Sequence, residues 1–227
     1  MKRSEINAVI KRFETLLAEH RFELPPFLAL TPDEWQTKGS EYDEIRDNQL
    51  GWDVTDYDMG NYRKLGLALI TLRNGNARNP KYTKSYAEKI MMLEPGQVSP
   101  MHFHWSKMED IINRGGGTVS FRLYNADEND GLAATDVPVY RDGLCYTVPA
   151  GSVVSLKPGE SLTLYPRCYH EFFVAEESGP VLIGEVSMCN DDNTDNRFYE
   201  PLGRFPTVEE DEPAYRLLCT EYPKAAR

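Results

Sequence analysis

Three of the chain's four histidines fall into a pattern of the kind that binds metal ions. His102 and His104 form an H-x-H pair, Glu109 follows after four intervening residues, and His170 lies in a later segment. In a β-strand alternate side chains share a face, so His102 and His104 point the same way. Glu109 can return to that face after a short bend, and His170 can come from a neighbouring strand. These nitrogen and oxygen donors suit a divalent first-row metal with room left for water or substrate.

Chance is the alternative explanation of this pattern, because an isolated H-x-H pair is common and most histidines are surface or satisfied core residues. Here turn signals surround the set. Residues 94–96 precede the pair, residues 115–117 follow Glu109, and Gly159 and Pro166 precede His170. The repeated order of turn, strand and ligand favours the metal site.

The elements that must position these residues are mostly short strands. Apolar and β-branched segments alternate with turns rich in Gly, Pro, Asn and Asp. The predicted strands span residues 65–72, 86–93, 98–104, 118–124, 145–148, 152–156, 161–165, 171–175 and 181–187. This punctuation predicts a mainly β fold, an antiparallel sandwich or barrel whose mouth can hold one ligand.

The N-terminal region predicts helices instead. Apolar residues between positions 4 and 20 recur at three-and-four spacing, with Ser4 as the expected N-cap. A second, short helix is predicted to begin at Thr31, which forms a capping box with Glu34. Pro25 and Pro26 predict an extended link between the two helices.

The chain length of 227 residues fits one structural domain with three parts. We expect residues 1–60 to form a helical cover without chemistry of its own and residues 61–206 to form the β-barrel. Residues 207–227 are expected to be a C-terminal extension. Its acidic run at 209–212 is interpreted as a solvated helix start or loop.

Composition and charge exclude some classes of binding partner. The chain has 36 Asp and Glu against 25 Lys and Arg, a formal charge of −11, so nucleic acid and anionic membrane are unlikely partners on electrostatic grounds. No window approaches the roughly 20 apolar residues of a membrane helix, and the start lacks the apolar stretch of a secretion signal. Four cysteines without C-x-x-C spacing are typical of reduced thiols, which predicts a cytoplasmic protein.

Two motifs around the ligands resemble a known family. The series Gly96-x5-His102-x-His104-x4-Glu109-x5-Gly115 resembles the first cupin motif. The series Gly159-x6-Pro166-x3-His170 resembles the second, with Cys168 in place of the expected glycine. More narrowly, HFHWSKMEDIINRGGG, GWDVTDYDMGNYRKLGLALITLRNG and GEVSMCNDDNTDNRFYEPLGRFP are similar to the D-lyxose isomerases, a cupin-type family of sugar isomerases.

The resemblance implies a fold, an activity and a metal. The fold is a cupin-type antiparallel β-barrel, a double-stranded β-helix or jelly roll, with helices at its N-terminus. The activity is aldose–ketose isomerisation of D-lyxose to D-xylulose, and of D-mannose to D-fructose, through a metal-held cis-enediolate. The metal implied is Mn²⁺, although three histidines and a glutamate also accept Fe, Co, Ni or Zn. The resemblance also implies a homodimer.

Two residues are candidates for proton transfer in such a reaction. Lys107 shares strand parity with Glu109, so its ammonium can hold a sugar hydroxyl or stabilise enediolate charge. If burial lowers its pKa, Lys107 can also move a proton; a surface lysine with a buried stem is the alternative. Glu185 lies amid an apolar strand, where an acid is either paired or functional, and it is our candidate base. An outward carboxylate on a half-buried strand is the alternative for Glu185.

Residues 190–197 are dense in the short donors and acceptors that bind sugar hydroxyls. Within this segment we expect Asp195 and Arg197 to contact the substrate, while Trp105 stacks on a pyranose face. Trp52 and Asp53 are further candidates. A plain Asx-rich turn is the alternative, whereas an EF-hand calcium loop is disfavoured because its Gly and final Glu are missing.

Two other functions compete with the isomerase. A cupin dioxygenase uses Fe or Ni with the same four ligands, but Lys107 and the polar segment 190–197 fit a polyhydroxylated substrate better. A non-catalytic sugar-binding or storage cupin is the other alternative. The presence of all four ligands, with a lysine between them, disfavours it.

Overall fold

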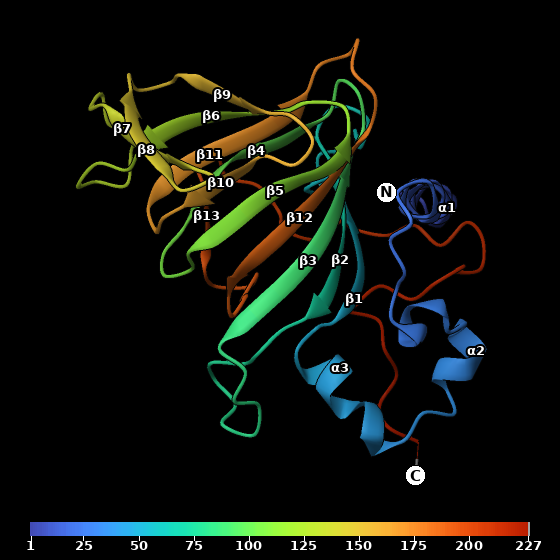
Figure 1. Ribbon diagram of the computed structural model, residues 1–227. Coiled ribbons are helices and arrows are strands. Elements are labelled where there is room, and N and C mark those ends of the chain that lie inside the picture. The colour runs from blue at the N-terminus through green and yellow to red at the C-terminus, as the bar shows by residue number, and fades with distance from the viewer. Residues whose placement is uncertain (227) are drawn as a thin grey trace.

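Two antiparallel β-sheets face each other in the computed structural model, which describes residues 1–226 (Figure 1). The sheets have the strand orders β1-β2-β3-β12-β5-β10-β7-β8 and β13-β4-β11-β6-β9. The strands are β1 Gly51–Thr55, β2 Leu67–Arg73, β3 Tyr86–Leu93, β4 Val98–His104, β5 Glu109–Gly116, β6 Val119–Asn125, β7 Val137–Arg141, β8 Leu144–Val148, β9 Val153–Leu156, β10 Ser161–Leu164, β11 Cys168–Val174, β12 Val181–Met188 and β13 Asn196–Phe198. The mainly β, cupin-type barrel expected from the sequence is confirmed.

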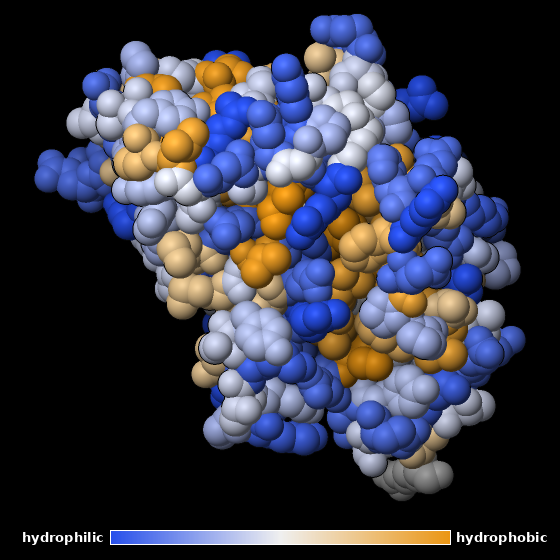
Figure 2. Space-filling view, viewed as in Figure 1, coloured by the Kyte–Doolittle hydropathy of each residue, from blue (hydrophilic) through white to orange (hydrophobic). Residues whose placement is uncertain are grey.

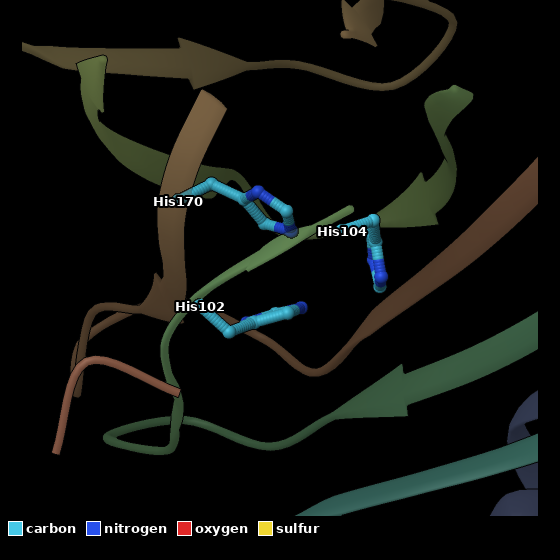
Figure 3. Close-up of side chains that lie close together, drawn as sticks. All are labelled: His102, His104 and His170. Carbon is cyan, nitrogen blue, oxygen red and sulfur yellow. The ribbon is translucent and has the colours of Figure 1, made fainter. Parts of the chain in front are cut away.

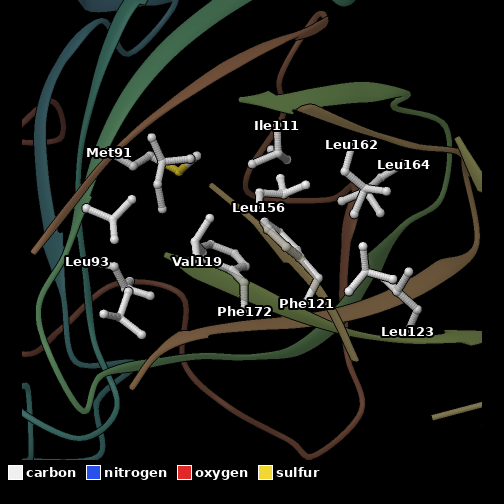
Figure 4. Packing of buried hydrophobic residues seen from close by; sticks show 14 of the residues in the cluster. Met91, Leu93, Ile111, Val119, Phe121, Leu123, Leu156, Leu162, Leu164 and Phe172 are labelled. Carbon is white, nitrogen blue, oxygen red and sulfur yellow. The ribbon is translucent and has the colours of Figure 1, made fainter. Parts of the chain in front are cut away.

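A hydrophobic core fills the space between the two sheets (Figure 4). Met91 and Ile111 enter it from the eight-stranded sheet, and Phe121 and Phe172 stack in it from the five-stranded sheet with ring centroids 5.5 Å apart. In β5 every second residue is buried, beginning with Glu109. Strand alternation therefore places Glu109 on the same inward face as Ile111, so one strand serves both the core and the site.

Helix α1 covers the outer side of the eight-stranded sheet. Its apolar stripe packs on β1 and β2, where Phe13 meets the ring of Trp52 edge to face at 5.8 Å. The predicted capping box of Thr31 and Glu34 is confirmed, but Pro26 begins a 3₁₀-helix instead of continuing an extended link. The helices are α1 Arg3–Glu19, η1 Pro26–Ala29, α2 Pro32–Trp35, η2 Ser40–Tyr42 and α3 Asp43–Asp47.

The C-terminal segment is tied to the start of α1. Ser4 is not the N-cap expected from the sequence: α1 begins at Arg3, and Ser4 Oγ donates to Asp211 Oδ2 at 2.6 Å. Arg3 forms an ion pair with Glu210 at 2.6 Å. The acidic run is thus a loop but not simply a solvated one. Its carboxylates lie beside the helix N-terminus, where the helix dipole favours negative charge.

Four strands were not foreseen, namely β1, β5, β7 and β13. β1 extends the eight-stranded sheet into residues that the sequence analysis assigned to the helical cover, pairing with β2 along its whole length. β5 and β13 have polar outward residues, which obscure the apolar alternation that marks a strand. Long-range pairing with neighbouring strands stabilises them nevertheless.

The surface is largely polar with a local apolar area. In the face shown, hydrophobic residues gather near the middle, over β12 and β3, and hydrophilic residues cover the periphery (Figure 2). Exposed apolar side chains on these strands include Tyr86, Val186 and Met188. Among residues 1–226, no helix has the length and apolar character that crossing a membrane requires.

Candidate active site

Three buried imidazoles converge inside the barrel (Figure 3). His102 and His104 lie on β4, and His170 lies on the adjacent β11, directly opposite His102 in the antiparallel register. One ring nitrogen from each histidine lies within 4.8 Å of those of the other two. The structure therefore brings together the three histidines that the sequence pattern selected.

Backbone carbonyls orient two of the rings. His102 Nδ1 lies 2.7 Å from Pro100 O, and His170 Nδ1 lies 3.0 Å from Cys168 O. A carbonyl only accepts, so Nδ1 carries the hydrogen and Nε2 keeps its lone pair. Burial, with the neighbouring histidines, holds the pKa of His102 well below its usual value, and burial lowers the pKa of His170 to about 4. Both rings are neutral near pH 7, as metal ligation requires.

Glu109, the fourth predicted ligand, lies beside the three histidines. It begins β5, and its Oε1 lies 3.4 Å from Nε2 of both His104 and His170. Burial alone would raise the pKa of Glu109, but Lys107 and His104 more than offset this, so the pKa lies well below its usual value. The imidazole nitrogens that face inward and the Glu109 carboxylate together form a cluster of electron-pair donors. A divalent cation bound among them would accept these electron pairs. The donors present therefore fit the metal that the resemblance implies.

Lys107 links Glu109 to the second acid. Its Nζ lies 2.7 Å from Glu109 Oε2 and 2.9 Å from Glu185 Oε1, and all three side chains are buried. Ser187 Oγ donates to the same Glu185 oxygen at 2.9 Å. Burial would lower the pKa of Lys107, but Glu109 and Glu185 raise it above its usual value. The lowered pKa considered from the sequence is therefore wrong for this arrangement, and the lysine stays an ammonium.

The charges continue beyond Glu185 to Lys89, Asp192 and Arg204, which the sequence did not single out, and to Asp53, which it named as a further candidate. Lys89 Nζ lies 3.7 Å from both Glu185 Oε1 and Asp192 Oδ1, and Arg204 Nη2 lies 2.9 Å from Asp192 Oδ2 and 2.6 Å from Asp53 Oδ2. We call this alternation of acids and bases the charge row. Its members are Glu109, Lys107, Glu185, Lys89, Asp192, Arg204 and Asp53.

One signal in the sequence could have found part of this row. Lys89 is a lone cation within the apolar strand β3, the same anomaly that singled out Glu185 in β12. A side chain of this kind is either paired or functional when buried. Asn190 joins the two lysines, because its Oδ1 accepts from Lys89 Nζ at 2.6 Å and from Lys107 Nζ at 3.4 Å.

The three residues expected to contact substrate lie outside the pocket lining. Asp195 holds the turn before β5, accepting the backbone N–H of Ser106 at 2.9 Å and of Lys107 at 3.1 Å. Trp105 is an exposed ring packed on Phe103. In these positions Asp195 holds the backbone of Lys107 and Trp105 faces the surface, and substrate contact by either residue stays a prediction.

The strand register explains why Arg197 does not line the pocket. In the β13–β4 pair Arg197 lies opposite Phe103, whereas Asn196 lies opposite His104 and Phe198 opposite His102. Side chains on one strand alternate between faces, so Asn196 and Phe198 share the histidines' face and Arg197 does not. Asn196 and Phe198 therefore line the pocket, where the sequence led us to expect Arg197.

The pocket combines the ligands, the charge row and an apolar wall. Its cavity volume is about 50 Å³, so the pocket is compact. Leu69, Met91 and Phe172 of the barrel core form the apolar part of the lining. Lys89 and Asp192 belong to its charged part. Trp52, a further sequence candidate, belongs to the core under α1, and its Nε1 donates to Leu28 O.

Comparison with known proteins adds independent findings. A family model described as D-lyxose isomerase matches residues 1–222. Two curated relatives named D-lyxose/D-mannose isomerase, from Escherichia coli O157:H7 and Serratia proteamaculans, are 48% and 49% identical over 223 residues, which is 98% of this chain and of each relative.

Solved structures with the same fold include two L-ribose isomerases. The enzyme of Acinetobacter sp. DL28, in complex with L-ribose, has a TM-score of 0.62 at 15% identity. That of Cellulomonas parahominis, with L-psicose, has a TM-score of 0.57 at 16% identity. Each match covers 92% of this chain and 98% of the other, so the likeness extends over most of the chain and not only over a few strands.

Proposed function

Because the chain belongs to the D-lyxose isomerase family, we propose that it interconverts D-lyxose with D-xylulose, and D-mannose with D-fructose, in a metal-dependent reaction. The observation that carries the proposal is the buried Lys107–Glu185 pair at 2.9 Å, next to three converging histidines and Glu109. Acid–base groups beside a cation site are what aldose–ketose isomerisation needs.

The reaction moves hydrogen between neighbouring atoms of the open-chain sugar. A proton leaves C2 of the aldose and returns to C1, while the hydroxyl proton on O2 moves to O1, so the aldehyde becomes an alcohol and C2 becomes a ketone. The intermediate is the substrate's cis-enediolate, whose negative charge must be stabilised. When bound to His102, His104, Glu109 and His170, a divalent metal, most simply Mn²⁺, would supply Lewis-acid stabilisation of that charge.

Glu185 is the proposed base for the carbon-bound proton. It lines the pocket, and both side chains that donate to it, Lys107 and Ser187, bond to Oε1. Oε2 is thereby left to take the proton from C2 and to deliver it to C1. Because one carboxylate oxygen is fixed by two donors, the other is held in a defined position, which favours a near-attack geometry.

Lys107 is proposed to act as a fixed ammonium. Its contacts with Glu109 and Glu185 keep it protonated, so it donates hydrogen bonds and does not abstract protons. Placed between the ligand set and the base, it can donate to a substrate oxygen as negative charge develops there. Lys89, held by Asn190 and 3.7 Å from the same Glu185 oxygen, supplies a second positive charge to the same pocket.

The test is ketose formation from D-lyxose and D-mannose by EDTA-treated protein, with and without added Mn²⁺. We expect activity to return with the metal and to fall about 10²–10⁴-fold in Glu185→Gln, which keeps the shape but loses the base. Glu88→Gln is the matched control, because Glu88 lies on β3 of the same sheet and pairs with Arg73 at its partly exposed face. Absence of turnover for any aldose, or turnover that requires oxygen, would overturn the isomerase.

The compartment and the assembly are further parts of the proposal. Cys145, Cys168, Cys189 and Cys219 are all free thiols, which supports a reducing compartment such as the cytoplasm. The family resemblance supports a homodimer. Sedimentation of the purified enzyme at micromolar concentration should give twice the 25.9 kDa chain mass, and a single monomeric species would contradict this assembly.

A further inference from the structure

Besides Nδ1 of His104, two polar atoms of the residues that line the pocket lack hydrogen-bond partners among residues 1–226. They are Arg204 Nη1, a donor, and Asn196 Oδ1, an acceptor, and both atoms are buried. Both side chains line the pocket that contains the histidines and Glu185. Buried polar groups in folded proteins are nearly always paired, and an unpaired one costs free energy. A donor and an acceptor left free in one cavity therefore point to a ligand group.

A second nitrogen or amide group in each of these side chains bonds to the same carboxylate, that of Asp192. Arg204 Nη2 donates to Asp192 Oδ2 at 2.9 Å and also to Asp53 Oδ2 at 2.6 Å. Asn196 Nδ2 lies 3.4 Å from Asp192 Oδ1 and 3.5 Å from Asp192 O. Both neighbours of Asn196 Nδ2 are acceptors, which settles the orientation of the amide and leaves Oδ1 as the free atom. Arg204 and Asn196 thus flank Asp192.

The position of this pair relative to the reacting centre follows from the strand register. Asn196 lies directly across from His104 in the β13–β4 pair, on the same face. Directly opposed residues have β-carbons about 5 Å apart. Lys89 separates Asp192 from Glu185, with 3.7 Å to each carboxylate. The free donor and acceptor therefore lie in the same cavity as the proposed base, and Lys89 and Asp192 separate them from it.

We propose that Arg204 and Asn196 form a specificity pair for one hydroxyl in the distal half of the open-chain sugar, at C4 or C5. Arg204 Nη1 donates to that hydroxyl oxygen, and the hydroxyl hydrogen is donated to Asn196 Oδ1. A hydroxyl is the common sugar group that accepts and donates at once. The inference rests on the proposed function, since it places C1 and C2 of an aldose beside Glu185.

A substrate without this hydroxyl leaves both buried atoms unpaired. Sites built to bond a substrate hydroxyl reject analogues that lack it, and two lost hydrogen bonds correspond to about 10- to 100-fold in kcat/KM. The pair does not touch the bond being rearranged. Its loss should therefore change discrimination among sugars while leaving Mn²⁺ affinity unchanged.

The experiment compares D-lyxose with its 4-deoxy and 5-deoxy analogues in wild-type enzyme, Asn196→Ala and Arg204→Lys. The measured quantity is the ratio of kcat/KM for D-lyxose to that for each analogue. Differences in ring opening between sugars cancel when this ratio is compared between enzymes. Asn193→Ala is the matched control: Asn193 is an exposed residue of the same loop whose side chain bonds only loosely to Gln49.

We expect wild type and Asn193→Ala to prefer D-lyxose over one analogue by about 10-fold or more, and the two pocket variants to reduce that preference to a few-fold. An unchanged preference in Asn196→Ala for both analogues would overturn the inference. Arg204→Lys can lower the melting temperature, because Asp53 and Asp192 lose their partner. In that case the result for Asn196→Ala alone tests the inference. Absence of D-lyxose turnover in wild type with Mn²⁺ would instead refute the proposed function.

Discussion

Removing the ammonium of Lys107 is the most informative single change to this site. Lys107→Ala leaves Glu109 Oε2 and Glu185 Oε1 without the cation that lies 2.7 Å and 2.9 Å from them. Both carboxylates are buried, with side chains 3% and 5% exposed, so water cannot easily replace the lysine. The variant retains all four proposed ligands. We therefore expect it to bind Mn²⁺ but to lose most turnover.

The magnitude follows from burial. Breaking a buried ion pair by deleting one partner costs about 3–5 kcal/mol, because the remaining charge is uncompensated. For a chain of this length each kcal/mol lowers the melting temperature by about 2–4 °C, so metal-free Lys107→Ala should melt about 6–20 °C below metal-free wild type. Mn²⁺ at 100 times its dissociation constant should return about 2.7 kcal/mol of the free energy of unfolding. Turnover should fall about 10²–10³-fold, the effect of losing one donor that stabilises developing negative charge.

The assay is calorimetry with and without Mn²⁺, combined with ketose formation at saturating D-lyxose. Lys81→Ala is the control, because Lys81 is an exposed lysine that does not line the pocket. Lys107→Arg should recover more stability than activity, since it keeps the charge but not the position of the donor. Unchanged turnover in Lys107→Ala would make the lysine a bystander, and an unchanged melting temperature would refute the assignment of Lys107 as the counter-ion of both acids.

Three further outcomes are expected. His104→Ala and His170→Ala should lose bound metal and activity but keep a folded barrel, as checked by metal analysis and circular dichroism; full activity of either variant after chelation would contradict the ligand set. Ser187→Ala should lower kcat about 3- to 10-fold with unchanged metal content, since it removes one donor to the proposed base; an equal loss for Ser85→Ala would point to a non-specific effect. Finally, the metal-free protein should lose stability as the pH falls from about 6.5 towards 4. The reason is that unfolded His170 binds a proton below about 6.5 but folded His170 only below about 4, a contribution of about 3 kcal/mol to the free energy of unfolding; urea titrations of wild type and His170→Gln at pH 7 and pH 4 should differ accordingly.

The cluster of three histidines could be predicted from the sequence because its geometry is largely local. His102 and His104 are two residues apart, so strand alternation alone puts them on one face. The turn signals before them define β4, whose bounds were predicted correctly as residues 98–104. His170 required one more step, its pairing with β4, and the second motif supplied it. Strand periodicity and turn chemistry are short-range properties, which is why the mainly β fold was also predictable.

The rest of the pocket depends on contacts between segments far apart in the chain. Asp53, Lys89, Asp192 and Arg204 come from four separate segments, and only the packing of β1, β3 and the loops around β13 aligns their charges. No spacing rule in the sequence predicts such an alignment. The pKa of Lys107 likewise depends on two acids, and only one of them is its neighbour in sequence.

The sequence by itself determined the family, the β architecture and the three histidines that could hold a metal, because local patterns carry each of them. Tertiary structure alone decided which face of β13 looks into the pocket. A shift of one residue in that short pairing would exchange Arg197 for Asn196, since strand side chains alternate with a period of two. The choice between these two side chains, and hence the hydroxyl-binding pair proposed for Asn196 and Arg204, is set by the hydrogen-bonded register between β13 and β4.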